Sequence, residues 1–316
     1  MTIPLTFFGS DQYSATVMQT LIASPEVTIT NLITTTSDPQ SPKTDPPWAE
    51  LHQLAKSHNI PITYYPDFLT SPARTILAGK IGILASFGHL IPPSILNLFP
   101  SGILCLHPSL LPQYRNTSPV PYAIALGDKT TGITLFQIDN TVDNGKILAQ
   151  QKEPILPSDT SPILLHRLFT IGAKLVISHL TQPAGPGPVG IKPHHPLIFT
   201  HKLTSESGHL EWEVVQKLIN NQPITASDTN NKLLKLRLSR LQPSTKYHQP
   251  NTILTDLIRA LDGWEKVWTI AKTKKGNLRI SLTLPLNFHQ SPTTYHILIS
   301  GKPNPISWND FQQYYL

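Results

Sequence analysis

A histidine and an aspartate have the sequence surroundings in this chain that best suit proton transfer. His107 ends an apolar run, and a proline follows that stops a strand and turns the chain. Asp143 lies with Asp139 in an acidic loop after a second apolar run, and Gly145 permits a tight turn there. Either residue alone is also typical of a turn or a loop cap. Placed at adjacent strand ends, they predict a proton-handling pair.

The elements that must position this pair alternate between strand-like and helix-like segments. Segments 81–86 and 102–106 are continuous apolar runs, as in strands that are covered on both faces. The other expected strands are 5–8, 27–34, 62–65, 133–139 and 146–150, and the expected helices are 13–22, 48–58, 119–126 and 159–180. This alternation predicts an α/β fold with an open, mostly parallel, Rossmann-like sheet, in which ligands bind beyond the carboxyl ends of the strands.

A second, smaller domain is expected after a segment rich in proline and glycine. Residues 182–198 lack periodicity and have the composition of a linker, so the predicted domains are 1–181 and 199–316. In the second domain, strands are expected at 233–241, 267–271, 277–284 and 295–299, with a helix at 253–261. The pattern favours a β-rich, barrel-like domain.

The charge of the chain is concentrated in this second domain. Residues 1–198 hold 11 Lys and Arg against 11 Asp and Glu, whereas residues 199–316 hold 14 against 8. Such a basic part suggests a polyanionic partner, with nucleic acid the commonest candidate, although a solvated basic surface has the same composition.

Other features of the sequence bear on the cellular compartment of the protein and on metal binding. A single cysteine, Cys105, fits a reducing compartment, and the first residues do not resemble a secretory signal. The most apolar window, 81–99, contains a histidine and two adjacent prolines, so we expect no membrane span. The 13 histidines form no metal-spaced set with cysteine or aspartate, so we expect no metal. We predict a cytoplasmic protein, and a monomer.

Several motifs together resemble one family. HPSLLP (107–112), the later Asp-x-Gly of 143–145, FFGSDQYSATVMQTL (7–21), ASFGHLIPPSIL (85–96), GDKTTGITLFQID (127–139) and FTHKLTSESGHLEW (199–212) follow one another in the family's order. The chain resembles the folate-dependent formyltransferases, and within them the enzymes that act on methionyl-tRNA. The segments 258–268 and 301–312 resemble that group more loosely. This implies transfer of a formyl group from 10-formyltetrahydrofolate to the amino group of methionyl-tRNA.

The resemblance also assigns roles to residues. His107 would stabilise the oxyanion and move protons, and Asp143 would hold a water and favour the charged form of the histidine. The folate-binding site would be lined by Ser109, Leu110, Leu111 and Pro112, together with Phe87, Gly88 and Leu90. The family has an asparagine where this chain has Cys105, and a thiol is a poorer oxyanion donor. The family's glycine after Arg115 is here Asn116, which tolerates the left-handed backbone better than most residues.

The predicted tRNA contacts are basic residues in both domains. The family's basic loop corresponds here to residues 35–47, which offer only Lys43. Arg115, Lys235, Arg237, Lys274 and Lys275 complete the predicted set.

Two alternatives remain open at this stage. One is a formyltransferase for another amine, such as an amino sugar or a glycinamide ribonucleotide, which has no evident need of a basic second domain. The other is a homologue that binds tRNA or folate but has lost turnover because of Cys105.

Overall fold

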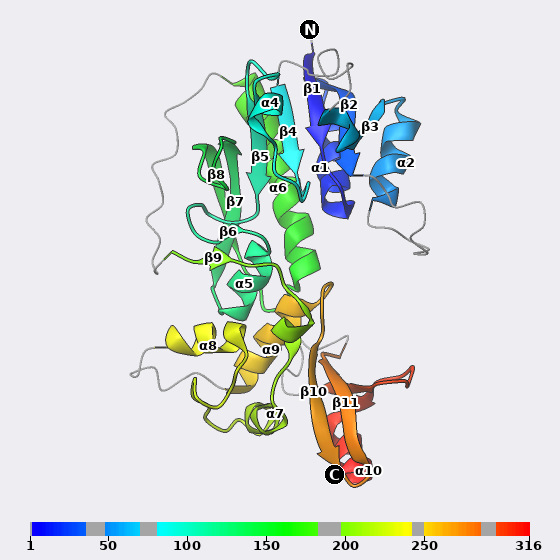
Figure 1. The fold of residues 1–316 in the computed structure, drawn as a ribbon, viewed down its shortest axis with the longest axis vertical. Coiled ribbons are helices and arrows are strands. Elements are labelled where there is room, and N and C mark those ends of the chain that lie inside the picture. The colour runs from blue at the N-terminus through cyan, green and yellow to red at the C-terminus, as the bar shows by residue number, and fades with distance from the viewer. Residues whose placement is uncertain (1, 36–47, 70–80, 183–196, 242–249, 286–294) are drawn as a thin grey trace. The chain divides into compact units, whose positions relative to one another are not determined.

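The computed structural model describes residues 2–35, 48–69, 81–182, 197–241, 250–285 and 295–316, and Figure 1 shows their course. These residues form two compact units. The first holds residues 1–116, 131–153 and 165–199, and the second holds residues 117–130, 154–164 and 200–316. The chain therefore enters the second unit twice before residue 181. Most of the predicted linker, and Lys43, lie outside the described residues.

The first unit is built on a seven-stranded sheet in the order β3-β2-β1-β4-β5-β7-β8 (Figure 1). Its strands are β1 (Ile3–Phe8), β2 (Val27–Thr35), β3 (Ile62–Tyr65), β4 (Ile81–Ala85), β5 (Ile103–His107), β7 (Thr130–Gln137) and β8 (Lys146–Pro154). The strands from β3 to β5 pair in parallel. The predicted mostly parallel α/β sheet is thereby confirmed.

One strand departs from the parallel order. β7 pairs antiparallel with β5, so that Gln137 lies opposite Leu104 and Thr134 lies opposite His107. The carboxyl end of β7 is therefore at the opposite end of β5 from His107. The expectation that His107 and Asp143 follow neighbouring strand ends is wrong in this respect. The loop after β7 must turn back to approach the histidine.

Helices of the first unit are α1 (Gln12–Ile22), α2 (Ala49–Ser57), α4 (Pro93–Leu96) and α6 (Ser161–Thr181), whose first residues belong to the second unit. Asp11 is the N-cap of α1, and its carboxylate accepts the backbone N–H groups of Tyr13 and Ser14. Because burial outweighs these bonds, the pKa of Asp11 is raised. The cap fixes where the chain leaves β1.

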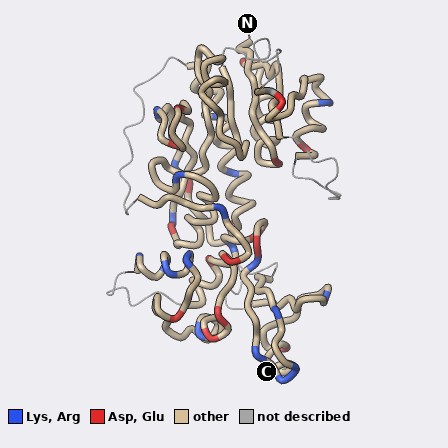
Figure 2. Tube along the Cα trace, in the orientation of Figure 1, with Lys and Arg blue, Asp and Glu red and all other residues tan. Residues whose placement is uncertain are grey.

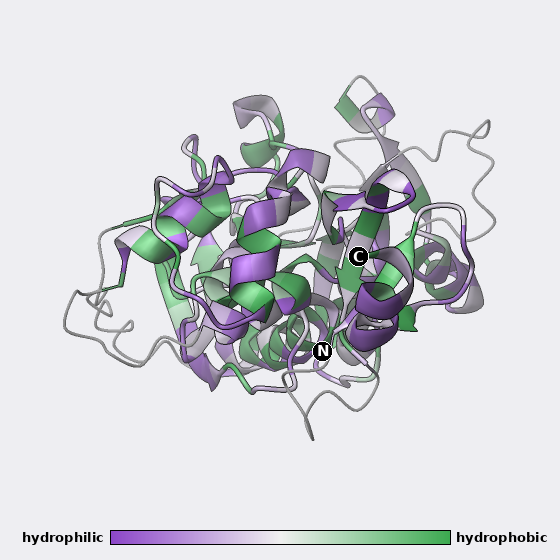
Figure 3. Cartoon of the chain, turned by 90° about the horizontal axis from the view of Figure 1, so that it is seen from below, coloured by the Kyte–Doolittle hydropathy of each residue, from purple (hydrophilic) through white to green (hydrophobic). Residues whose placement is uncertain are grey.

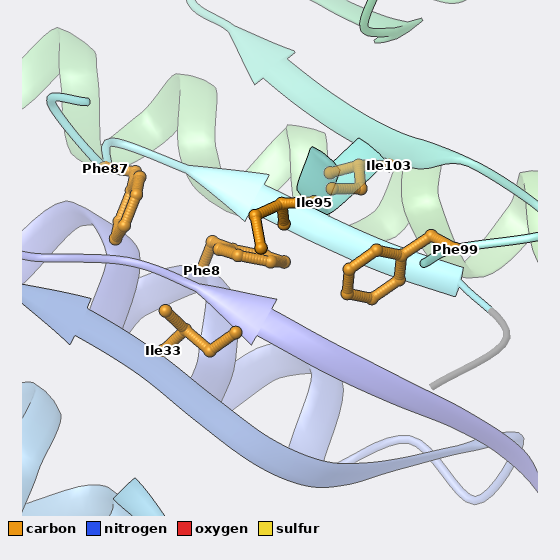
Figure 4. Close-up of a cluster of buried hydrophobic side chains, with 6 residues drawn as sticks. All are labelled: Phe8, Ile33, Phe87, Ile95, Phe99 and Ile103. Carbon is orange, nitrogen blue, oxygen red and sulfur yellow. The ribbon is translucent and has the colours of Figure 1, made fainter. Parts of the chain in front are cut away.

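The core beside β1 and β4 is aromatic and aliphatic. Figure 4 shows the cluster, which consists of Phe8, Ile33, Phe87, Ile95, Phe99 and Ile103. The Phe8 ring meets Phe87 and Phe99 edge-on, with ring centroids 5.6 and 5.7 Å away. Burial of such side chains contributes about 1.5–3 kcal/mol each. This cluster anchors the loop that follows β4.

Among the described residues, α6 has the length and composition of a membrane span. It nevertheless packs within the first unit, where Leu168 and Val176 are fully buried. A Cβ added at Gly172 would lie 2.6 Å from the side chain of Ile133 on β7, so the helix packs closely there.

The second unit contains a four-stranded antiparallel sheet and several helices. The sheet is β10 (Val267–Thr273), β11 (Gly276–Thr283), β12 (His296–Ile299) and β13 (Ile306–Ser307). The helices are α5 (Pro119–Ala125), α7 (Trp212–Ile219), α8 (Lys232–Ser239), α9 (Pro250–Leu261) and α10 (Trp308–Tyr315). α5 packs against α8 and α9. Helices in Figure 3 carry both hydrophobic and hydrophilic residues, as helices that bury one face do.

The strand expected at 233–241 is wrong, since residues 232–239 form α8. Its leucines alternate with polar residues as in a strand, but Asn231 caps a helix by accepting the backbone N–H of Leu234. Leu233, Leu234 and Arg237 then share the buried side.

Candidate active site

Strand β5 carries two of the predicted site residues on one face. Side chains alternate along a strand, so Cys105 and His107 point to the same side. β5 lies between β4 and β7, and all five of its residues are buried. The strand therefore holds both side chains in fixed positions.

The His107 ring is oriented by a backbone carbonyl. Its Nε2 lies 2.8 Å from the carbonyl oxygen of Tyr114. Because a carbonyl only accepts, Nε2 must carry the hydrogen, which leaves Nδ1 to gain or lose a proton. Nδ1 lies 3.6 Å from Oδ2 of Asp143, and the two side chains are 7% and 17% exposed. The structure thus brings together the two residues that the sequence paired.

The acidic loop delivers one of its two aspartates to the histidine. Asp143 Oδ2 accepts the backbone N–H of Asn116 at 2.7 Å. Asp139 instead closes a local turn by accepting the N–H and hydroxyl of Thr141, and these bonds lower the pKa of Asp139. Gly145 lets the loop close, since a Cβ there would lie 1.8 Å from the backbone oxygen of Gln137.

Cys105 is a neutral thiol in an apolar setting. It packs with Leu111 and Phe136, and it is 8% exposed. Burial, and then the charge of Asp143, raise the pKa of the Cys105 thiol well above its ordinary value. A thiol in this state is a poor nucleophile.

The HPSLLP loop is held by two residues that the sequence analysis did not single out. The Thr134 hydroxyl donates to the carbonyl of Ser109 at 2.6 Å and accepts the N–H of Leu111 at 3.1 Å. Gln150 Nε2 donates to Leu111 O and to Thr134 Oγ1, each at 2.9 Å. Thr134 gives a weak signal as a polar residue within an apolar run, and Gln150 gives none, because its strand is polar around it.

The residues predicted to line the folate site differ in exposure. Ser109 and Leu111 are buried within their own loop, whereas Leu110 and Pro112 are partly exposed. Phe87 belongs to the core cluster. Gly88 and Leu90 lie on the surface, and Leu90 is 73% exposed.

The loop after β4 is tied to the start of α1. The Ser10 hydroxyl donates to the carbonyls of Ser86 and Phe87, and the Ser86 hydroxyl donates to Asp11. These hydrogen bonds fix the backbone that leads to Gly88 and Leu90.

The predicted tRNA-contacting residues are placed differently from one another. Lys235, Lys274 and Lys275 are exposed, and the turn between β10 and β11 is strongly basic in Figure 2. Arg115 is half-buried, with its guanidinium 5.9 Å from the ring of Phe199.

The prediction that Arg237 contacts tRNA is wrong. Its guanidinium is buried, and Nη2 lies 3.3 Å from Asp256, which also binds Arg259 at 2.6 Å. Arg237 therefore belongs to an internal ion network of the second unit, and it does not present its charge to a phosphate.

No group of three or more metal-ligating side chains occurs within the portion of the chain that the structure describes.

Comparison with known proteins shows which family the chain resembles. A family described as formyl transferase matches residues 71–180, which include β4, β5, β7, β8 and both members of the His107–Asp143 pair. The methionyl-tRNA formyltransferase of Streptococcus pyogenes serotype M28 is 31% identical over 227 residues, which are 69% of this chain and 71% of that protein. The chain belongs to the formyltransferase family. The methionyl-tRNA formyltransferase of Roseiflexus sp. strain RS-1 is also 31% identical, over 67% of this chain and 66% of that protein.

A solved structure supports the family's fold over most of the chain. The sugar N-formyltransferase from Shewanella sp. FDAARGOS_354 aligns with a TM-score of 0.52 at 16% identity, covering 89% of this chain and 97% of that one. The chain spans about two thirds of the length of the curated relatives named above.

Proposed function

We propose that this enzyme transfers the formyl group of 10-formyltetrahydrofolate to the amino group of methionyl-tRNA in the cytoplasm. The observation that carries the proposal is the pair of buried His107 and partly buried Asp143, in a chain of the formyltransferase family. The acceptor is taken from the curated relatives, which are methionyl-tRNA formyltransferases.

The reaction joins the amine nitrogen to the formyl carbon and breaks the bond from that carbon to N10 of the folate. The amine loses a proton and N10 gains one, so a group near the formyl carbon must accept a proton and donate one. His107 Nδ1 is suited to this task, since Nε2 keeps its hydrogen on the Tyr114 carbonyl. Asp143 lies where its negative charge would offset a positive charge on the ring.

The formyl oxygen becomes an oxyanion in the tetrahedral intermediate, and it needs a hydrogen-bond donor. The Cys105 thiol lies on the face of β5 that carries His107, but it is a weak donor. We therefore expect the His107 ring to carry most of this stabilisation, and the turnover to be modest.

The test is formylation of charged methionyl-tRNA with 10-formyltetrahydrofolate by wild type, His107→Ala and Asp143→Ala. We expect each variant to lower kcat by about a hundredfold or more. Asp139→Ala is the matched control, because it removes an exposed carboxylate of the same loop that bonds Thr141. Full activity of His107→Ala would overturn the assignment, and faster formylation of an amino sugar or a glycinamide ribonucleotide would overturn the acceptor.

A further inference from the structure

One short segment contacts both members of the candidate catalytic pair. The Tyr114 carbonyl accepts His107 Nε2–H at 2.8 Å, and the Asn116 N–H donates to Asp143 Oδ2 at 2.7 Å. Residues 114 and 116 are separated by a single residue. The backbone between them therefore helps to set the separation of the imidazole and the carboxylate.

This segment has an unusual backbone. Tyr114 and Asn116 have φ angles of 59° and 80°, and Asp143 has a φ of 47°. Left-handed conformations are disfavoured for residues with a side chain, least so for asparagine and aspartate. Such conformations persist where the surroundings fix them, and they are common at functional sites.

The Asn116 side chain itself has no role in this contact. The residue is exposed, and the group that meets Asp143 is its backbone N–H. The direction of that N–H depends on the backbone angles of the segment. The choice of amino acid at position 116 therefore acts through conformation.

We propose that Asn116 is a positioning residue, whose left-handed backbone aims its N–H at Asp143 and keeps the carboxylate beside His107. The inference rests on the proposed function, since it assumes that the pair acts in formyl transfer. A hydrogen bond to a charged acceptor is roughly twice as strong as a neutral one, so a single N–H suffices to orient the carboxylate.

The test compares substitutions that differ in their tolerance of a positive φ. Asn116→Gly keeps the N–H and accepts the conformation at no steric cost, whereas the β-branched side chain of Asn116→Val opposes it. Asn59→Val is the matched control, because Asn59 is also exposed and left-handed, with a φ of 54°, and it follows α2.

We expect Asn116→Val to lower kcat by about tenfold to a hundredfold, with KM for the formyl donor within about threefold. Asn116→Gly should recover most of the rate. Asn59→Val should lower the melting temperature by as much as Asn116→Val and leave kcat unchanged. An Asn116→Val enzyme with wild-type kcat would overturn the proposal, as would an Asn59→Val enzyme with an equal loss of kcat.

A second readout is independent of formyl transfer. Hydrogen exchange of the residue 116 amide, followed by NMR, should accelerate in Asp143→Ala and in Asn116→Val relative to wild type. Unchanged exchange in Asp143→Ala would overturn the positioning role even in an active enzyme. Slow exchange that depends on Asp143, in a protein without formyl transfer activity, would leave the contact intact and reject the proposed function instead.

Discussion

Individual residues at the site were predictable where a sequence motif marks them. HPSLLP and the following Asp-x-Gly identify His107 and Asp143, and the structure brings their side chains within 3.6 Å. Which ring nitrogen of His107 faces Asp143 was not predictable. It is fixed by the Tyr114 carbonyl, whose direction depends on a left-handed backbone at a tyrosine, a residue type that gives no signal for that conformation.

Burial is the other property that residue types did not reveal. Arg237 has the charge of a phosphate ligand, but its guanidinium is enclosed with Asp256 and packs against Gly127. A count of basic residues cannot separate such a residue from Lys274 or Lys275, which are exposed.

Cys105 gives a prediction at the residue scale. Cys105→Asn should raise kcat by about tenfold to a hundredfold, because an amide N–H is a far better oxyanion donor than a thiol on the same face of β5. Steady-state formylation of methionyl-tRNA measures the effect. Cys105→Ala, which supplies no donor, should show no gain. Equal rates for the two variants would mean that the donor lies elsewhere.

At the scale of elements, the sheet was predicted well and the direction of one strand was not. Apolar runs such as β4 and β5 identify covered strands, because every position must be buried. The same pattern suits either direction, so β7 was expected to end near His107 although it ends opposite Leu104. α8 was mistaken for a strand, since its leucines alternate at strand spacing.

The loop between β7 and β8, which carries Asp143, gives a prediction at the scale of elements. Gly145→Ala should lower kcat by about tenfold or more, because a Cβ 1.8 Å from Gln137 O displaces the loop that carries Asp143. The neighbouring exposed Asn144, changed to alanine, is the control and should keep its rate. Rate measurements at saturating methionyl-tRNA will check both. A fully active Gly145→Ala would show that the loop has another way to close.

For the whole molecule, composition predicted a basic second part, and exposed lysines lie in it. Lys274 and Lys275 lie at the turn between β10 and β11, and Lys275 Nζ lies 4.5 Å from the ring centroid of Tyr315. Composition could not place these charges on the surface. It also could not show that residues 117–130 and 154–164 join the second unit.

The lysines give the prediction at this scale. Changing Lys274 and Lys275 to glutamine should weaken tRNA binding and reduce the slope of log affinity against log salt by about one for each phosphate that the variant no longer neutralises. Binding titrations at several salt concentrations measure that slope. Lys56→Gln with Lys152→Gln removes the same charge from exposed positions of the first unit and should leave the slope unchanged. Equal slopes for both double variants would show that tRNA binds another surface of the protein.

The interleaving of the two units affects where the gene can be divided. A fragment ending at residue 181 would keep α5 but remove α8 and α9, the helices against which α5 packs. Val120, Ala123 and Ile124, which are fully buried in the intact chain, would then meet water. The proline-rich segment is therefore a poor site for truncation, and exchange of the carboxyl-terminal part with a homologue would have to carry residues 117–130 and 154–164 with it.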